Sequence, residues 1–213
     1  GANIAAIGDG SPQNWEVFQF ANATLVAPRT YEISVRLRGQ AGTDGLMPAA
    51  WPIGSTFVLL NDAVKQIELP LSARGLPRYY RFGPANKGYD SSATVLRSES
   101  FDGAGLRPYP VSHLSSSPQT SGALDISWQR RTRIDGDSWQ SLEVPLGEDS
   151  EQYSVRISQG ATTLREATTA MPSFSYTAAM QAADAASGTI SIAVAQVSQR
   201  YGNGPFQTLT AAL

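Results

Sequence analysis

Residues 15–44 read WEVFQFANATLVAPRTYEISVRLRGQAGTD, and this stretch decides the fold class. Between Tyr31 and Leu37 apolar residues alternate strictly with polar ones, which is the period-2 pattern of a half-buried strand. The apolar run before it is broken by Ala27-Pro28-Arg29, a sequence that favours a turn. In the first arm Val17-Phe18 sets two apolar side chains next to each other, which indicates either a β-bulge or a strand buried on both faces. The stretch therefore predicts a long β-hairpin in an all-β protein.

The composition excludes several classes of function. The chain has 213 residues, of which 41% are apolar and only 16% are charged, against about 25% charged in typical globular proteins. Its net charge of -2 gives no basic field for nucleic acid or for an anionic membrane. The absence of cysteine excludes a disulfide, a thiol nucleophile and a thiolate metal site. No apolar run approaches the roughly 20 residues of a membrane-spanning helix, so we expect no membrane insertion.

The start of the chain shows no recognisable targeting signal. No signal peptide is recognisable, and the first residues already resemble a strand. Because the sequence opens Gly-Ala-Asn without a methionine, we interpret it as a fragment of a longer protein.

The first part of the chain, residues 1–105, predicts a small all-β barrel or sandwich domain. Short β-like segments follow one another about 8 to 12 residues apart, with Gly and Pro between them. Beyond the hairpin, strands are expected at Thr56–Leu60, Val64–Leu69, Arg78–Phe82 and Thr94–Phe101. The segment Gly103–Pro110 combines two flexible glycines with two stiffening prolines, and we interpret it as a linker at a domain boundary.

Residues 106–213 predict a second domain with seven strands, the number typical of an immunoglobulin-like sandwich. The expected strands are Val111–Ser115, Gly122–Trp128, Tyr153–Ser158, Thr162–Ala167, Ser173–Tyr176, Ile190–Val197 and Phe206–Thr210. Trp128 falls on an alternating strand, which places it in the core. The alanine-rich stretch Thr177–Ala186 favours one or two helical turns.

This second part resembles a fibronectin type III domain. The features that carry the resemblance are the proline-led start, the Trp128 strand, Tyr153–Ile157, and Ile190–Ser198 with the Gly-Asn-Gly-Pro turn after it. The sequence departs from the family at Ile190, where a corner tyrosine is expected. It also departs at residues 130–152, because that connection is much longer than usual.

Taken as a whole, the chain resembles the C-terminal part of the large tail-tip (baseplate) protein of alphaproteobacterial gene transfer agents, which are phage-like particles, and of related siphophage tails. The residues that carry this resemblance are Gln19–Leu25, Leu37–Asp44, Leu69–Leu71, Gly105–Tyr109 and Trp128–Trp139. The resemblance implies a place at the distal tail tip of the virion, contact with the recipient cell, and other tail or baseplate proteins as partners. A glycoside-hydrolase-like barrel, if the parent has one, is implied to lie upstream.

Catalytic chemistry finds little support in the sequence. His113 is the only histidine, and its place beside the linker favours a solvated position over a catalytic one. With one histidine and no cysteine, a zinc site is not expected. Asp135-Gly136-Asp137-Ser138 suggests a calcium loop, but the further oxygen ligands of that loop are missing and a tight turn explains it better. We therefore predict no catalytic residues, no metal and no cofactor.

The long connection at residues 130–152 is the candidate binding loop, because long loops on a rigid scaffold are usually functional. Its candidate residues are Arg130, Arg131, Arg133, Asp135, Asp137 and Trp139. We expect an ordered excursion, an extra hairpin, with its arginines turned outward toward a tail partner or a cell-surface glycan. Asp135, Asp137 and Glu143 are expected to neutralise the arginines locally. Trp15, Trp51 and Trp139 lie in or beside loops, where stacking on a sugar or a partner competes with burial as local core.

These observations predict two tandem all-β domains without catalytic activity. The expected function is that of a structural and adhesive module in a phage-like tail tip. The alternative is a carbohydrate-binding accessory module of a tail-borne or secreted glycoside hydrolase. A free-standing enzyme is the least supported class, because the usual histidine and cysteine chemistry is missing.

Overall fold

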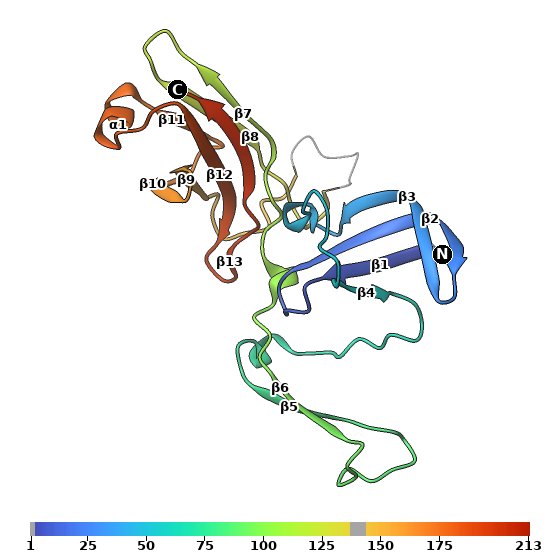
Figure 1. Cartoon of the computed structure of the whole chain (residues 1–213). Coiled ribbons are helices and arrows are strands. Elements are labelled where there is room, and N and C mark those ends of the chain that lie inside the picture. Colours follow the sequence, from blue (N-terminus) through green and yellow to red (C-terminus); the bar gives the residue numbers. More distant parts are fainter. Residues whose placement is uncertain (1–2, 137–143) are drawn as a thin grey trace.

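The computed structural model describes residues 3–136 and 144–213, and it confirms the all-β fold class. The strands lie in three parts, which Figure 1 shows from top to bottom: a β-sandwich, a four-stranded sheet and a two-stranded ribbon. The second half of the chain builds the sandwich, and the first half builds the other two parts. No helix within the described ranges is long and apolar enough to cross a membrane.

The opening hairpin belongs to the four-stranded antiparallel sheet, whose strand order is β3-β2-β1-β4. Its strands are β1 (Asn3–Gly8), β2 (Trp15–Ala27), β3 (Thr30–Gln40) and β4 (Thr56–Leu59). The predicted hairpin is therefore confirmed as β2 and β3, and Arg29 turns the chain between them with a φ of 60°. The β2–β3 ladder shifts its register between Val17 and Gln19. The adjacent apolar residues at 17 and 18 thus mark a bulge.

Strand β3 of this hairpin departs from the half-buried strand that the sequence predicts. On β2, at the base of the hairpin, Phe18 is only 6% exposed, but Tyr31, Val35 and Leu37 on β3 are 59%, 70% and 58% exposed, and Ile33 is only partly buried. Their alternation is that of a strand with a buried face, yet no second layer of the described chain covers this end of the sheet. The prediction of burial is wrong here because one strand's pattern does not supply the layer that covers it.

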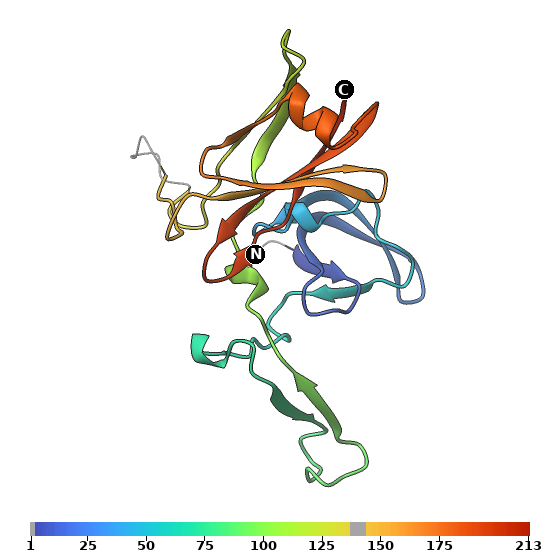
Figure 2. The same ribbon diagram turned by 90° about the vertical axis from the view of Figure 1, so that its left-hand side faces the viewer.

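The two-stranded ribbon extends away from the rest of the molecule, as Figures 1 and 2 show from two directions. It consists of β5 (Arg78–Phe82) and β6 (Val95–Glu99), which pair antiparallel with each other. Both strands were predicted from the sequence. We call residues 74–103, which include the ribbon and its base, the arm.

The predicted strand at Val64–Leu69 is wrong, because these residues form no strand. Val64 and Ile67 are exposed on a connection between β4 and the arm. A strand needs a neighbour to satisfy its backbone N–H and C=O groups, and none lies beside this segment in the described structure. The first half of the chain also contains three short 3-10 helices at Asp44–Leu46, Leu71–Ala73 and Ala104–Leu106.

The sandwich contains all seven strands that the sequence predicts in the second half. One sheet has the order β11-β8-β7, and the other has the order β10-β9-β12, with β13 and β14 both paired to β12. The bounds are β7 (Ser112–Pro118), β8 (Leu124–Gln129), β9 (Tyr153–Gln159), β10 (Thr162–Thr169), β11 (Ser173–Tyr176), β12 (Thr189–Ser198), β13 (Gly202–Asn203) and β14 (Gln207–Ala212). The two-residue β13 was not predicted, because it is a bridge within a turn. The helical turn is confirmed as α1 (Ala178–Ala183), capped by the Thr177 hydroxyl.

The core of the molecule lies between the two sheets of the sandwich. Its fully buried side chains come from β8, β9 and β12 on facing sheets, and from β11. Trp128 packs edge-on against Tyr153 with 5.2 Å between ring centroids, a favourable aromatic geometry. Trp128 is only 4% exposed, so the prediction that it belongs to the core is confirmed.

Candidate functional site at the junction of the two halves

The sandwich and the four-stranded sheet meet at the segment predicted to be a linker. Gly103–Pro110 begins with a 3-10 turn and ends with Pro108 and Pro110, both of which are buried. Val111, the next residue, already belongs to the sandwich core. The segment is therefore a packed connection and not a free spacer. The proposed division of the chain at residues 105 and 106 stays a prediction.

Two glycines of the four-stranded half let it approach the other side of the junction closely. A Cβ atom added to Gly42 would lie 2.2 Å from the ring of Tyr109, and Gly42 has a φ of 77°. A Cβ atom added to Gly45 would lie 2.6 Å from Pro205, on the far side of the junction. Real Cβ atoms do not come this close to other heavy atoms. Any side chain at these positions would therefore push the halves apart.

One predicted residue, Arg131, joins the two halves electrostatically. Its Nη1 donates a hydrogen bond to Oδ2 of Asp44 at 2.7 Å, and Asp44 belongs to the four-stranded half. Its guanidinium carbon also lies 5.4 Å from the ring centroid of Tyr109, within the range of a cation–π interaction. Both side chains of the ion pair are about one-third exposed, so the pair orients the halves more than it stabilises them.

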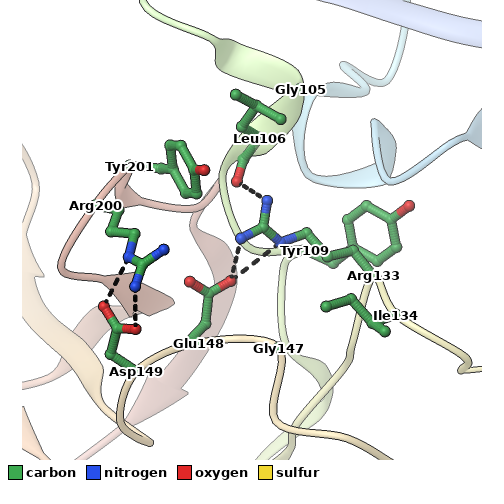
Figure 3. Close-up of a pocket in the computed structure, with 10 residues that line it drawn as sticks. All are labelled: Gly105, Leu106, Tyr109, Arg133, Ile134, Gly147, Glu148, Asp149, Arg200 and Tyr201. Carbon is green, nitrogen blue, oxygen red and sulfur yellow. Dashed lines mark hydrogen bonds and ion pairs between the residues drawn. The ribbon is translucent and has the colours of Figure 1, made fainter. Parts of the chain in front are cut away.

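A second predicted residue, Arg133, is enclosed more completely. Figure 3 shows its guanidinium group between Glu148 and the main-chain oxygen of Leu106, and it donates to both. Its Nη2 lies 2.9 Å from Oε1 of Glu148, whose side chain is 5% exposed. Arg133 therefore fixes both ends of the long connection against the segment that joins the halves.

The third predicted arginine, Arg130, closes the long connection on itself. Its guanidinium group donates to the main-chain oxygens of Val144 at 2.8 Å and Pro145 at 2.9 Å. All three arginines thus make internal contacts, and the prediction that they turn outward is wrong. Among the described residues, the ion pairs of Arg131 and Arg133 are made by Asp44 and Glu148 and not by Asp135. Asp137 and Glu143, also expected to neutralise the arginines, lie outside the described residues. Asp44 lies 87 residues from Arg131, so no local pattern points to it, whereas Glu148 belongs to the same connection as Arg133.

The remaining candidate residues are Asp135, Asp137 and Trp139. Asp135 is exposed and has a φ of 47°, the left-handed conformation that aspartate tolerates in tight turns. Asp137 and Trp139 lie outside the described residues. Residues 130–136 and 144–152 form no strand, so the predicted extra hairpin is not present in the part of the connection that the structure describes.

A cleft of about 510 Å³ lies beside the junction (Figure 3). It is lined by Gly105, Leu106, Tyr109, Arg133, Ile134, Gly147, Glu148, Asp149, Arg200 and Tyr201. Arg200 pairs with Asp149, with 3.1 Å between Nη2 and Oδ1, next to the pair that Arg133 makes with Glu148. Because both arginines face carboxylates, the cleft offers no free positive charge to an anionic ligand. Among the described residues no three His, Cys, Asp or Glu side chains come close enough to hold a metal ion.

Tyr201 connects the sandwich to the base of the arm. The guanidinium carbons of Arg74 and Arg133 each lie 5.0 Å from the centroid of its ring. Arg74 also donates from Nη1 to the main-chain oxygen of Arg200 at 2.6 Å. Two cations over one aromatic ring hold the arm base, the long connection and the β12–β13 turn together. No sequence pattern predicts this cluster, because Arg74, Arg133 and Tyr201 lie more than 50 residues from one another in the chain.

A second structural cluster holds the base of the four-stranded sheet. Glu16 is fully buried and forms a two-pronged pair with Arg38, with distances of 2.8 Å and 2.7 Å. It also accepts a hydrogen bond from Nε1 of Trp51 at 2.6 Å. Burial alone raises the pKa of Glu16, but the hydrogen bonds from Arg38 and Trp51 outweigh it, so that its pKa lies below the ordinary value. Trp51 thus acts as local structure, one of the two roles that the sequence leaves open for it.

The arm carries aromatic side chains with large exposed fractions. Tyr79 is 74% exposed and Tyr89 is 76% exposed, and Phe82 beside them is half-exposed. The sequence predicts the strand Arg78–Phe82 but not its exposure, because an aromatic run between prolines is also typical of a buried strand. The arm was therefore missed as a candidate interaction surface.

Comparison with known proteins supports only the first part of the chain directly. Residues 1–58 match a family model described as "Rcc01698-like, C-terminal". This match covers the four-stranded sheet from its first strand into β4. No protein of curated function matches the chain.

Two solved structures are similar at low identity. One is domains d3–d4 of the rat CD45 extracellular region, with 10% identity, 90% of this chain and 94% of that chain covered, and a TM-score of 0.36. The other is the FN1–FN3 domains of chicken CNTN1, with 12% identity, 99% of this chain and 66% of that chain covered, and a TM-score of 0.31.

Proposed function

We propose that this chain is a non-catalytic structural and adhesive module of a phage-like tail tip, of the gene transfer agent and siphophage kind. In this role it joins other tail or baseplate proteins and takes part in contact with the recipient cell. The sequence resemblance to tail-tip proteins supplies the setting. The family match over residues 1–58 falls on the same sheet that holds part of that resemblance.

The observation that carries the proposal is the amount of apolar surface that the described chain leaves uncovered. On the hairpin and the arm, strands with large apolar side chains face solvent, among them Leu25, Tyr31, Val35, Leu37, Tyr79, Phe82 and Leu96. Isolated two-stranded ribbons are marginally stable in water, and apolar patches of this kind mark protein interaction sites. A subunit whose neighbours complete its surface explains both features.

The junction gives the proposal a mechanical basis. Buried prolines, close glycine contacts and the Arg131–Asp44 pair fix the sandwich relative to the four-stranded sheet. The Arg74 contacts with Tyr201 and Arg200 tie the base of the arm to the same place. The chain therefore presents its exposed strands at defined positions, as an assembly subunit requires.

Removing the ribbon tests this role. Residues 78–99 are replaced by a short Gly-Ser link in the tail-tip protein of a particle that carries this chain. We expect the chain to keep its sandwich, measured by circular dichroism and melting, while particle assembly or DNA delivery is lost. The control replaces Gly160-Ala161, an exposed turn between β9 and β10, with Gly-Ser. Normal assembly and delivery without the ribbon would contradict the proposal.

The second candidate function is carbohydrate binding, and the exposed rings of Tyr79 and Tyr89 favour it. Flat, solvent-facing aromatic rings can stack on sugar rings while their hydroxyl groups form hydrogen bonds. A glycan array probed with the chain, and with the Tyr79→Ala and Tyr89→Ala variants, separates the two functions. Saccharide binding that both substitutions abolish supports the binding module, and absence of binding leaves the structural role.

A further inference from the structure

The β3 strand is an unpaired sheet edge. It lies at the end of the order β3-β2-β1-β4, and β2 is the strand that pairs with it in the described chain. Eleven residues long, it leaves one row of backbone groups facing outward. Such an edge is a template on which another strand adds, unless charge or covering segments prevent it.

The sequence of this edge is complementary to itself when read in the opposite direction. Residues 31–37 read YEISVRL, with Ser34 at the centre. In an antiparallel pair of two copies centred on Ser34, Glu32 lies opposite Arg36 of the second copy. Ile33 then lies opposite Val35, and Tyr31 opposite Leu37. On either side of the central Ser34, which lies opposite Ser34 of the second copy, each opposed pair within residues 31–37 is thus apolar with apolar or acidic with basic, and such pairs stabilise antiparallel strands.

The two charged groups are available for this pairing. Glu32 and Arg36 are both exposed, and neither takes part in an ion pair or side-chain hydrogen bond within the described residues. Other registers lose the match. Centring on Val35 sets Glu32 against Arg38, which Glu16 already holds. A shift by one residue sets polar side chains against apolar ones.

We infer that β3 pairs with β3 of a second copy about a two-fold axis at Ser34. The two four-stranded sheets then form one continuous antiparallel sheet across the axis. The pairing brings Tyr31, Val35 and Leu37 of both copies onto one face, where they cover one another. The same patch meets itself, as a two-fold interface requires. This inference does not rest on the proposed tail-tip role.

Val35 indicates that pairing is coupled to a local change of the backbone. Its φ is 53°, the left-handed region, in which a β-branched residue is a true outlier. The register with β2 is the same on both sides of it, at Asn22 with Ser34 and at Phe20 with Arg36. Only one residue must therefore become extended to complete the edge. Until then the kink interrupts the edge, one of the devices that limit uncontrolled strand addition.

Charge reversal tests the pairing and its register together. The molar mass of the 213-residue chain is measured by light scattering and sedimentation over a range of concentrations. We expect the parent to form dimers, and the Glu32→Arg and Arg36→Glu variants to remain monomers, because each sets like charges opposite each other twice. An equimolar mixture of the two variants should dimerise again, because both opposed pairs are then opposite in charge. Arg29→Glu, in the turn outside the register, is the control and should dimerise as the parent does.

A single cysteine tests the axis independently. The chain has no cysteine, so Ser34→Cys introduces one thiol that faces its own copy across the axis. Directly opposed residues in an antiparallel pair have Cα atoms about 4.5–5.5 Å apart, within the range of a disulfide. We expect Ser34→Cys to form a covalent dimer on mild oxidation, and Thr24→Cys, exposed on the inner strand β2, to form far less.

Two results overturn the inference. One is a parent chain that stays monomeric at every concentration. The other is a pair of charge variants that dimerise alone as well as the parent does, or that fold but fail to associate when mixed. Circular dichroism establishes the folding of each variant first.

Discussion

The sandwich and the β2–β3 hairpin carry the same alternating sequence pattern but bury it to very different extents. The inward side chains of β8 are between 1% and 4% exposed (Leu124, Ile126, Trp128). The corresponding side chains of β3 are between 58% and 70% exposed (Tyr31, Val35, Leu37). Alternation therefore shows which face of a strand is suited to burial. It does not record whether the covering layer belongs to the same chain.

The physical cause is the presence or absence of a second layer. In the sandwich, β8 faces β9 and β12 of the other sheet, and Trp128 meets Tyr153 between them. In the first half, the loop that carries Trp51 covers the base of the sheet where Glu16 and Phe18 lie. The distal hairpin has no such cover in the described chain. Stability should therefore reside mainly in the sandwich and the junction.

The largest expected effect comes from breaking the covered region. Trp128→Ala should reduce the free energy of unfolding of the sandwich by about 3–5 kcal/mol, because it leaves a large cavity between the sheets. Denaturant titration followed by circular dichroism measures this value. A loss below about 1 kcal/mol, the centre of the range for ordinary substitutions, would show that Trp128 is not central to the core.

The next effect concerns the covered base of the four-stranded sheet. Glu16→Gln leaves the Arg38 guanidinium without its counter-ion in a buried cluster. Breaking a buried pair costs about 3–5 kcal/mol, but Arg38 is 30% exposed and water can solvate it in part, so we expect about 2–3 kcal/mol. The control is Asp149→Asn, which breaks an exposed pair with Arg200 and should cost no more than about 1 kcal/mol. Equal losses in the two variants would contradict the assigned difference in burial.

The same cluster makes stability depend on pH. The pKa of folded Glu16 lies below its ordinary value of 4.5, so its contribution is fully present above that value. It is lost as the pH falls through the lower, folded pKa, because protonation then breaks the contacts with Arg38 and Trp51. Unfolding measured between pH 6 and pH 3 (about the range that spans an ordinary glutamate pKa) should show this acid-side loss for the parent. The Glu16→Gln variant should show less of it.

A smaller effect is expected where the two regions meet. Gly42→Ala sets a Cβ atom against the Tyr109 ring, and it also forces alanine into a left-handed conformation. Gly202→Ala is the matched control, because its φ is 79° and no atom lies within 4 Å of its added Cβ. Both variants carry the cost of the left-handed backbone, so their difference isolates the clash. We expect Gly42→Ala to be less stable than Gly202→Ala by about 1–2 kcal/mol. No difference in melting would mean that the junction is looser than the structure shows.

The sequence predicted the fold well wherever strands are local and covered. The hairpin, the arm strands and all seven sandwich strands follow from periodicity and turn residues, and Trp128 is in the predicted core. The strand at Val64–Leu69 failed because periodicity cannot tell whether a partner strand lies alongside. The division into domains at residues 105 and 106 stays a prediction, although Pro110 and Val111 show that the connection itself is packed.

The binding role of the candidate arginines stays a prediction, and the contacts that they make inside the molecule were not predicted. Arg130, Arg131 and Arg133 lie in the long connection at the junction of the two halves, and each makes contacts inside the molecule. Asp44 is 87 residues from Arg131 in sequence, and no local pattern reveals a partner that distant. The exposure of the arm was not predicted for a different reason. Its aromatic strand has a composition typical of a buried strand.

The smallest loss of stability is expected for Leu37→Ala. Compared with Leu124→Ala, it tests the difference between the two regions directly, because the same residue type is removed in both. Leu37→Ala removes an exposed side chain from β3, and Leu124→Ala removes a buried one from β8. In dilute solution, where the chain is monomeric, Leu37→Ala should change the free energy of unfolding by less than about 0.5 kcal/mol. Leu124→Ala should cost about 2–5 kcal/mol, because it leaves a cavity. At higher concentration Leu37→Ala should weaken self-association, since its side chain lies opposite Tyr31 of the second copy in the inferred pairing. If Leu37→Ala costs the monomer as much as Leu124→Ala does, the chain itself covers the outer face of the hairpin, and the contrast between the two regions disappears.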